Sequence, residues 1–70
     1  MSGVRPQKEI LEQRNKLIRK YYGIDSFLQQ NPGYALENSL RGKMLVFWMG
    51  VIQLNWVLGL PEDDESGALG

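Results

Sequence analysis

The pattern of apolar and polar positions divides the chain into two helical segments. The first covers residues 7–22, which are rich in helix-forming residues, and its apolar positions line one side of a helix. This stripe consists of Ile10, Leu11, Leu17, Ile18, Tyr21 and Tyr22. Pro6 suits the first turn of such a helix, and Gly23 suits a left-handed stop. The pattern therefore predicts an amphipathic helix that ends near Tyr22.

The second segment is a nearly continuous apolar run from Met44 to Leu60. Thirteen of its 17 residues are apolar, none is charged, and the polar exceptions are Gln53 and Asn55. As a helix the run is about 26 Å long, against a bilayer hydrocarbon core of about 30 Å. The sequence therefore predicts a single transmembrane span over about 44–60.

A break separates the two segments at Asn31, Pro32 and Gly33. We expect the second helix to begin near Tyr34, continue through the span and end at Gly59–Pro61. The predicted fold class is all-α: an amphipathic N-terminal helix, the Asn-Pro-Gly break and one long helix. Its three parts are a basic helix with its connector (1–33), the long helix (34–60) and an acidic tail (61–70) that we expect to be mobile.

Charge is strongly segregated along the chain, although the formal net charge is zero. Residues 1–43 hold all eight basic residues and four acidic ones, whereas residues 61–70 hold four acidic residues and no basic one. The positive-inside tendency places the N-terminal part on the cytoplasmic, matrix or stromal side. The prediction is a single-pass protein of the mitochondrial inner membrane, the thylakoid or the bacterial inner membrane. Four basic residues are expected to anchor it at the membrane interface, with anionic lipids among their partners: Arg41, Lys43, Arg19 and Lys20.

Composition removes several kinds of chemistry. The chain has no cysteine and no histidine, which excludes disulfides, thiolate metal sites and histidine-activated nucleophiles. The acidic residues 62–65 lack the spacing of a calcium-binding EF-hand. A basic segment attached to a membrane-length apolar run favours a membrane over a nucleic acid. We therefore expect no enzyme activity, cofactor, metal or nucleic-acid partner.

The two amides of the apolar run diverge by about 200° around a helix. In a bilayer, amide side chains require hydrogen-bond partners, so two faces of the span would need neighbouring helices. Bonding of each amide to its own backbone is the equal alternative. The residues predicted to pack on partner helices are Gly50, Gln53, Asn55, Trp48 and Trp56.

Three interpretations remain for the N-terminal stripe. Docking on a larger partner is favoured, because Glu9 and Glu12 on the same helix weaken pure binding to anionic lipid. The stripe would otherwise lie on lipid headgroups or pack on the second helix of the chain itself.

These features favour a non-catalytic accessory subunit that stabilises or helps to assemble a larger integral-membrane complex. Respiratory and photosynthetic electron-transfer complexes are the expected hosts, an association by type of protein. The first alternative is a soluble, obligately oligomeric helical interaction module that hides residues 44–60 in a shared interface. The second is a small regulatory peptide of a transporter. Extraction with alkaline carbonate separates the membrane and oligomer hypotheses, and a fixed stoichiometry separates a subunit from a regulator.

Overall fold

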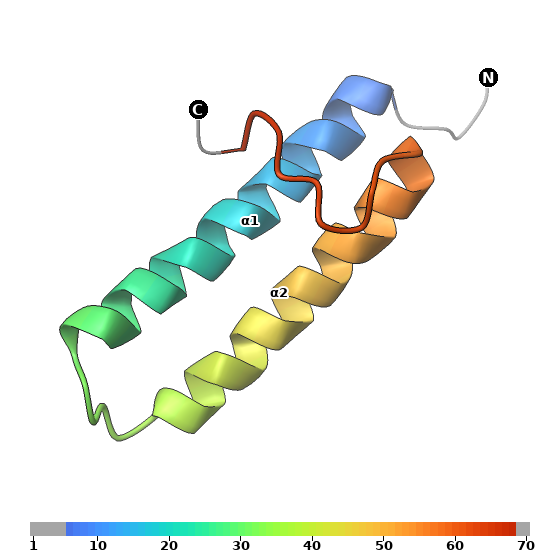
Figure 1. Ribbon diagram of the computed structural model, residues 1–70. Coiled ribbons are helices and arrows are strands. Elements are labelled where there is room, and N and C mark those ends of the chain that lie inside the picture. The colour runs from blue at the N-terminus through green and yellow to red at the C-terminus, as the bar shows by residue number, and fades with distance from the viewer. Residues whose placement is uncertain (1–5, 69–70) are drawn as a thin grey trace.

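The computed structural model describes residues 6–68 and shows a helical hairpin with a C-terminal tail folded against it (Figure 1). The first helix, α1, spans Gln7–Gln30, and the second, α2, spans Glu37–Leu58. The two helices lie side by side and antiparallel, and the tail crosses both of them (Figure 1). The all-helical part of the predicted fold class is confirmed for the described residues.

The first helix does not stop at Gly23, and that prediction is wrong. Gly23 is helical, and α1 continues for two further turns to Gln30. These added turns bury Leu28 and carry the contact with α2 farther along the hairpin. Apolar packing against a second helix outweighs the weak helix propensity of one glycine, which amounts to about 1 kcal/mol.

The connector between the helices is as sharp as its sequence predicts. Asn31 ends α1: its backbone N–H and its side-chain amide both donate to the carbonyl of Phe27, at 3.0 and 2.9 Å. Pro32 disfavours a helical conformation at Asn31, and Gly33 takes a positive φ of 81°. The rings of Phe27 and Tyr34 meet edge to face at 5.0 Å across the turn. The second helix begins at Glu37, slightly later than expected.

The C-terminal end of α2 lies inside the apolar run. Gly59 adopts a left-handed conformation, with φ of 74°, and Leu60 donates its N–H back to the carbonyl of Asn55 at 2.8 Å. Within residues 6–68, no helix has both the length and the apolar character that a membrane crossing requires. The predicted transmembrane span is therefore unsupported, because only Met44–Leu58 of the run is helical and the earlier turns of α2 carry Arg41 and Lys43.

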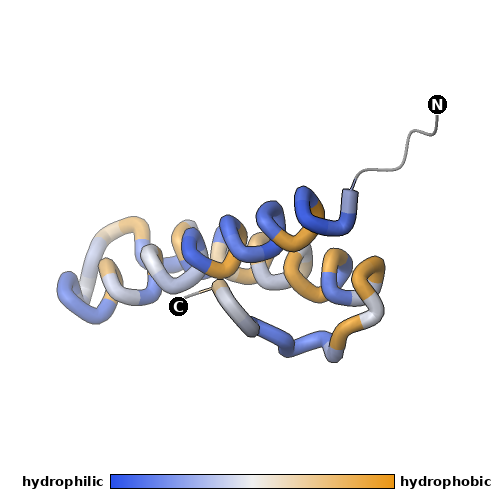
Figure 2. The backbone as a smooth tube through the Cα atoms, turned by 90° about the horizontal axis from the view of Figure 1, so that it is seen from above, coloured by the Kyte–Doolittle hydropathy of each residue, from blue (hydrophilic) through white to orange (hydrophobic). Residues whose placement is uncertain are grey.

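The tail returns over the open side of the hairpin. Figure 2 shows its hydrophilic stretch running along one side of both helices. A turn at 65–68 places Ala68 in the core, where only 4% of the residue is exposed. There Ala68 contacts Ile18 of α1 and Val51 of α2, which are completely buried. The described part of the tail, which we expected to be mobile, is thus a third layer of the fold.

Candidate functional site

A buried arginine lies at the centre of the three layers. Arg14 occupies the stripe of α1, between the apolar residues one turn before and one turn after it, and its side chain is completely buried. Its guanidinium donates to Asn55 Oδ1 of α2 at 3.1 Å and to the backbone carbonyls of Asp64 and Ser66 at 2.9 and 2.6 Å. Asn15 Oδ1 accepts two further N–H groups, at 3.0 and 2.5 Å. We name Arg14, together with the residues whose oxygens accept from it (Asn15, Asn55, Asp64 and Ser66), the arginine clasp.

The tail supplies the negative charge of the arginine clasp. Asp64 Oδ2 lies 2.5 Å from Arg14 Nη1 in an ion pair. The hydrogen bond from Arg14 is the main cause that lowers the pKa of the Asp64 carboxyl, and the hydroxyl of Ser66 adds to it. Asp64 therefore stays ionised to a lower pH than an ordinary aspartate.

Asn55 joins α2 to the same cluster. Its amide is completely buried, and its Nδ2 donates to the carbonyls of Glu62 and Asp64 at 3.1 and 3.0 Å. Both ends of the amide are thereby satisfied within the chain: one accepts from Arg14 and the other donates to the tail backbone. Asn55 therefore bonds within the chain, to α1 and to the tail, and not to the backbone of its own helix.

A second pair of hydrogen bonds holds the tail about one to two turns farther along α1. The hydroxyl of Tyr22 donates to Glu65 Oε1 at 2.6 Å, and Arg19 donates to the carbonyl of Ala68 at 3.4 Å. The hydrogen bond to the Glu65 carboxylate is the main cause that raises the pKa of Tyr22, with burial as a further cause. Among the described residues, every buried side-chain nitrogen and oxygen has a hydrogen-bond partner. The arginine clasp is therefore saturated and fastens the tail to both helices.

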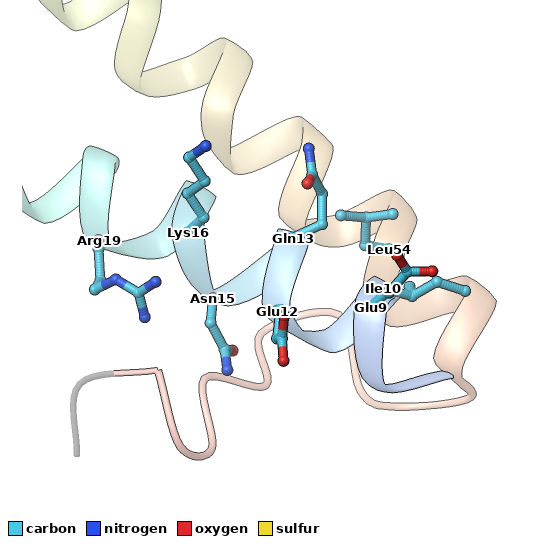
Figure 3. Close-up of a pocket in the computed structure, with 8 residues that line it drawn as sticks. All are labelled: Glu9, Ile10, Glu12, Gln13, Asn15, Lys16, Arg19 and Leu54. Carbon is cyan, nitrogen blue, oxygen red and sulfur yellow. The ribbon is translucent and has the colours of Figure 1, made fainter. Parts of the chain in front are cut away.

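One surface groove of about 750 Å³ adjoins the arginine clasp on α1. Its lining residues are Glu9, Ile10, Glu12, Gln13, Asn15, Lys16, Arg19 and Leu54. Figure 3 shows that these side chains do not converge: Gln13 and Lys16 point to one side of α1, while Glu12 and Asn15 point toward the tail. The groove thus lacks the convergent polar groups that define a small-molecule site.

The most unusual surface is the side of α2 that faces away from the rest of the chain. Five large apolar residues on it are more than half exposed: Leu45 (62%), Val46 (66%), Met49 (56%), Trp56 (80%) and Val57 (57%). At 100° per residue they fall within one third of the helix circumference, with the exposed Gln53 among them. We name this surface the outer face. It contrasts with the opposite side of α2, where Met44, Val51 and Asn55 are buried.

The residues predicted to pack on partner helices divide between these two sides of α2. Trp48 lies inside, with its ring 5.0 Å from that of Tyr21, and a Cβ on Gly50 would lie 2.9 Å from Leu17 Cδ1. Asn55 is also inside. Trp56 and Gln53 lie outside. The predicted divergence of the two amides is present: one is in the arginine clasp and the other on the outer face.

The N-terminal stripe is used within the chain. Ile18 is in the core, and Leu17 and Tyr22 pack against it together with Trp48. The other members of the stripe, Ile10, Leu11 and Tyr21, are half-buried. Packing on the second helix of the chain, the third interpretation of the stripe, is the one that the structure displays.

The four predicted anchoring residues are exposed but do not form one patch. Arg41 pairs with Glu37 one turn away at 2.8 Å, and the ammonium of Lys20 lies 5.8 Å from the centre of the Phe47 ring. Lys20 and Lys43 border a groove of about 430 Å³ whose other lining residues are Gly23, Ile24, Phe27, Leu40 and Phe47. Arg19 lies farther along α1, against the tail.

Comparison with known proteins gives no match: no family model fits the chain, and no curated protein or solved structure is significantly similar to it.

Sequence reasoning missed the arginine clasp, although one signal for it was present. Arg14 lies three or four residues from Ile10, Leu11, Leu17 and Ile18, so it occupies the apolar stripe itself. A charged residue at such a position needs a buried partner. The acidic tail, which has no basic residue of its own, can supply that partner.

Proposed function

We propose that this protein is a non-catalytic helical interaction module, which joins a larger assembly by packing the outer face of α2 against a helix of another polypeptide. The observation that carries the proposal is the exposure of five large apolar side chains on one side of a helix. Contiguous apolar surfaces of this kind mark interaction sites in folded proteins. The exposed fractions correspond to roughly 600 Å², with Trp56 contributing about a third.

The rest of the fold supports this role. The other side of α2 is occupied by α1 and by the tail, which the arginine clasp and the Tyr22–Glu65 hydrogen bond hold in place. These contacts fix the conformation of α2, so the outer face is already ordered before a partner binds. Preorganisation of this kind lowers the entropic cost of association. Tryptophan and methionine are also the residue types that are enriched in interface cores.

The test is isolation of the protein from its native source together with its companions. The double variant Met49→Glu/Trp56→Glu places two charges on the outer face and should lose companions that the wild type retains at a fixed ratio. The control variant Gln7→Glu/Gln13→Glu adds the same charge at exposed positions of α1 and should retain them. Circular dichroism verifies that both variants are folded. Companions that stay at an unchanged ratio with the Met49→Glu/Trp56→Glu variant would refute the proposal.

A more specific form of the proposal is an accessory subunit of an integral-membrane complex, in which the outer face would meet membrane-embedded helices. Its support is the uncharged run Met44–Leu60 and the basic residues Arg41 and Lys43 just before it. Respiratory or photosynthetic electron-transfer complexes are the proposed hosts. Resistance of the protein to alkaline carbonate extraction would support this form, and release without detergent would leave only the general one.

A further inference from the structure

We infer that the groove bordered by Lys20 and Lys43 binds a free, single-chain anionic amphiphile, such as a fatty-acid carboxylate. The groove has a volume of about 430 Å³ and lies between α1 and α2. None of the described residues that line it belongs to the outer face, so the inference goes beyond the proposed function and does not depend on it. Three observations carry it: two lysines without an ionic partner, apolar walls and a glycine that the fold does not require.

The two lysines give the groove an uncompensated positive charge. Lys20 belongs to α1 and Lys43 to α2, and both are exposed. Within residues 6–68, neither ammonium has an ion pair or a hydrogen bond, and that of Lys20 lies 5.8 Å from the centre of the Phe47 ring. Among the lining residues that the structure describes, none is acidic. A groove that combines charges of one sign with apolar walls concentrates counter-ions, so its complement is an anion.

The remaining side chains that line the groove are apolar. Ile24 and Phe27 line it from α1, and Leu40 and Phe47 line it from α2. From Lys20 to Phe27 the groove follows α1 for about 10 Å, and its end beside the connector is formed by Phe27 and Leu40. Hydrocarbon lying along these walls leaves water, while an anionic group can receive hydrogen bonds from the two ammonium groups. An inorganic anion would use only the lysines, and a neutral hydrocarbon would use only the walls.

Gly23, which also lines the groove, gives independent support. It lies in the interior of α1, where glycine is a weak helix former. Its conformation is helical, and a Cβ at this position would meet nothing within 4 Å. Neither the backbone nor the packing of the described chain therefore requires a glycine here. A ligand in the groove supplies a reason, because the missing side chain leaves room for it.

The experiment is a calorimetric titration of the purified full chain with dodecanoate, kept below its critical micelle concentration. We expect saturable binding of one dodecanoate per chain. Two further probes separate the contributions of charge and chain. Acetate carries the same anionic group without the hydrocarbon, and dodecyltrimethylammonium carries the same hydrocarbon with the opposite charge. Each should bind at least tenfold more weakly than dodecanoate.

Removal of the two lysine charges should weaken dodecanoate binding. An exposed ion pair contributes up to about fivefold in affinity, so Lys20→Gln/Lys43→Gln should weaken binding by roughly 5- to 25-fold. Lys8→Gln/Lys16→Gln is the matched control, because it removes the same charge at exposed positions of α1 outside this groove. Its affinity should stay within about twofold of the wild type, in the range that screened charges at a distance allow.

Filling the groove should also weaken binding. Gly23→Leu places an apolar side chain in the space beside the groove, and leucine is a good helix former, so α1 should be retained. Gly42→Leu is the matched control: Gly42 is helical and exposed, has open space around it and does not line the groove. Circular dichroism verifies that all four variants are folded. Dodecanoate should bind more weakly to Gly23→Leu and unchanged to Gly42→Leu.

Several results would overturn the inference. They are the absence of saturable dodecanoate binding, equal binding of dodecyltrimethylammonium, and unchanged affinity in Lys20→Gln/Lys43→Gln. Binding to vesicles of phosphatidylglycerol without binding of free dodecanoate would show recognition of a membrane surface and overturn it as well. If Met49→Gln/Trp56→Gln weakened binding as much as the loss of both lysines does, dodecanoate would lie on the outer face and not in this groove.

Discussion

Replacement of Arg14 tests most sharply how the three layers of the fold are joined. Arg14→Met keeps an unbranched apolar stem of similar reach and removes the guanidinium. Asn55 Oδ1, which is completely buried, then loses the N–H that it receives from Arg14. The carbonyl of Ser66, an exposed residue, loses its donor as well, whereas the carbonyl of Asp64 keeps the N–H that it receives from Asn55.

The expected cost follows from these contacts. A hydrogen bond to a charged group contributes about 1.5–3 kcal/mol, and a buried acceptor left unpaired costs about 1–3 kcal/mol. We therefore expect Arg14→Met to lower the free energy of unfolding by about 3 kcal/mol. A chain of this length has a total stability of roughly 4–10 kcal/mol, so the loss is a large fraction of it.

Urea unfolding followed by circular dichroism at one fixed protein concentration measures this loss. Lys16→Met is the matched control, because Lys16 is an exposed basic residue on the same helix. Its effect should stay within about 0.5 kcal/mol of the wild type. If Arg14→Met were equally mild, the arginine clasp would not hold the tail in the way described. In a double-mutant cycle with Asn55→Leu, the sum of the stability losses of the two single variants should exceed the stability loss of the double variant.

Four further substitutions test other parts of the fold by the same unfolding assay. Gly23→Ala should stabilise the chain by about 0.5–1 kcal/mol, because Gly23 is helical with open space around it. Gly59→Ala should destabilise the chain, because the φ of Gly59 is 74°. Destabilisation by Gly23→Ala would indicate that α1 ends at Gly23 after all. The lowered pKa of Asp64 adds stability that is present above the unfolded pKa of about 3.9 and is lost as pH falls through the folded pKa. The stability advantage of the wild type over Asp64→Asn should therefore shrink in acid. An advantage that does not change with pH would contradict this. The raised pKa of Tyr22 adds stability that is present below the unfolded pKa of about 10 and is lost as pH rises through the folded pKa. The wild type should therefore lose more stability in alkali than Tyr22→Phe. Equal alkaline losses would show that the hydrogen bond to Glu65 does not favour the protonated tyrosine.

The sequence predicted the helical elements well because local patterns determine them. Asn31-Pro32-Gly33 breaks the chain through backbone constraints that no tertiary contact can remove. Gly59 likewise ends α2 where a left-handed residue is needed. Gly23 misled the prediction because a glycine stop is only a local preference, and the continuation of α1, which buries Leu28, outweighs it.

The tertiary partners of the polar residues were beyond local patterns. The bonds of Arg14 to Asp64 and Ser66 join residues that are 50 and 52 positions apart in the chain. A tail rich in acidic residues reads as solvated when it is considered alone. The buried charge on α1 is one of the tail's partners, and Asn55 of the apolar run bonds to the same charge; no pattern within either segment indicates these contacts.

Burial of Trp56 upon association is the most direct consequence of the proposed function. The variant Trp48→Phe leaves Trp56 as the single tryptophan, and this residue is 80% exposed in the isolated chain. Tryptophan emission and acrylamide quenching should be measured on the dilute chain and on the assembled form that carries its native companions. We expect solvent-exposed emission in the dilute chain, and a blue shift with protection from quenching in the assembled form. Equal exposure of Trp56 in both forms would show that the outer face is not where this protein binds.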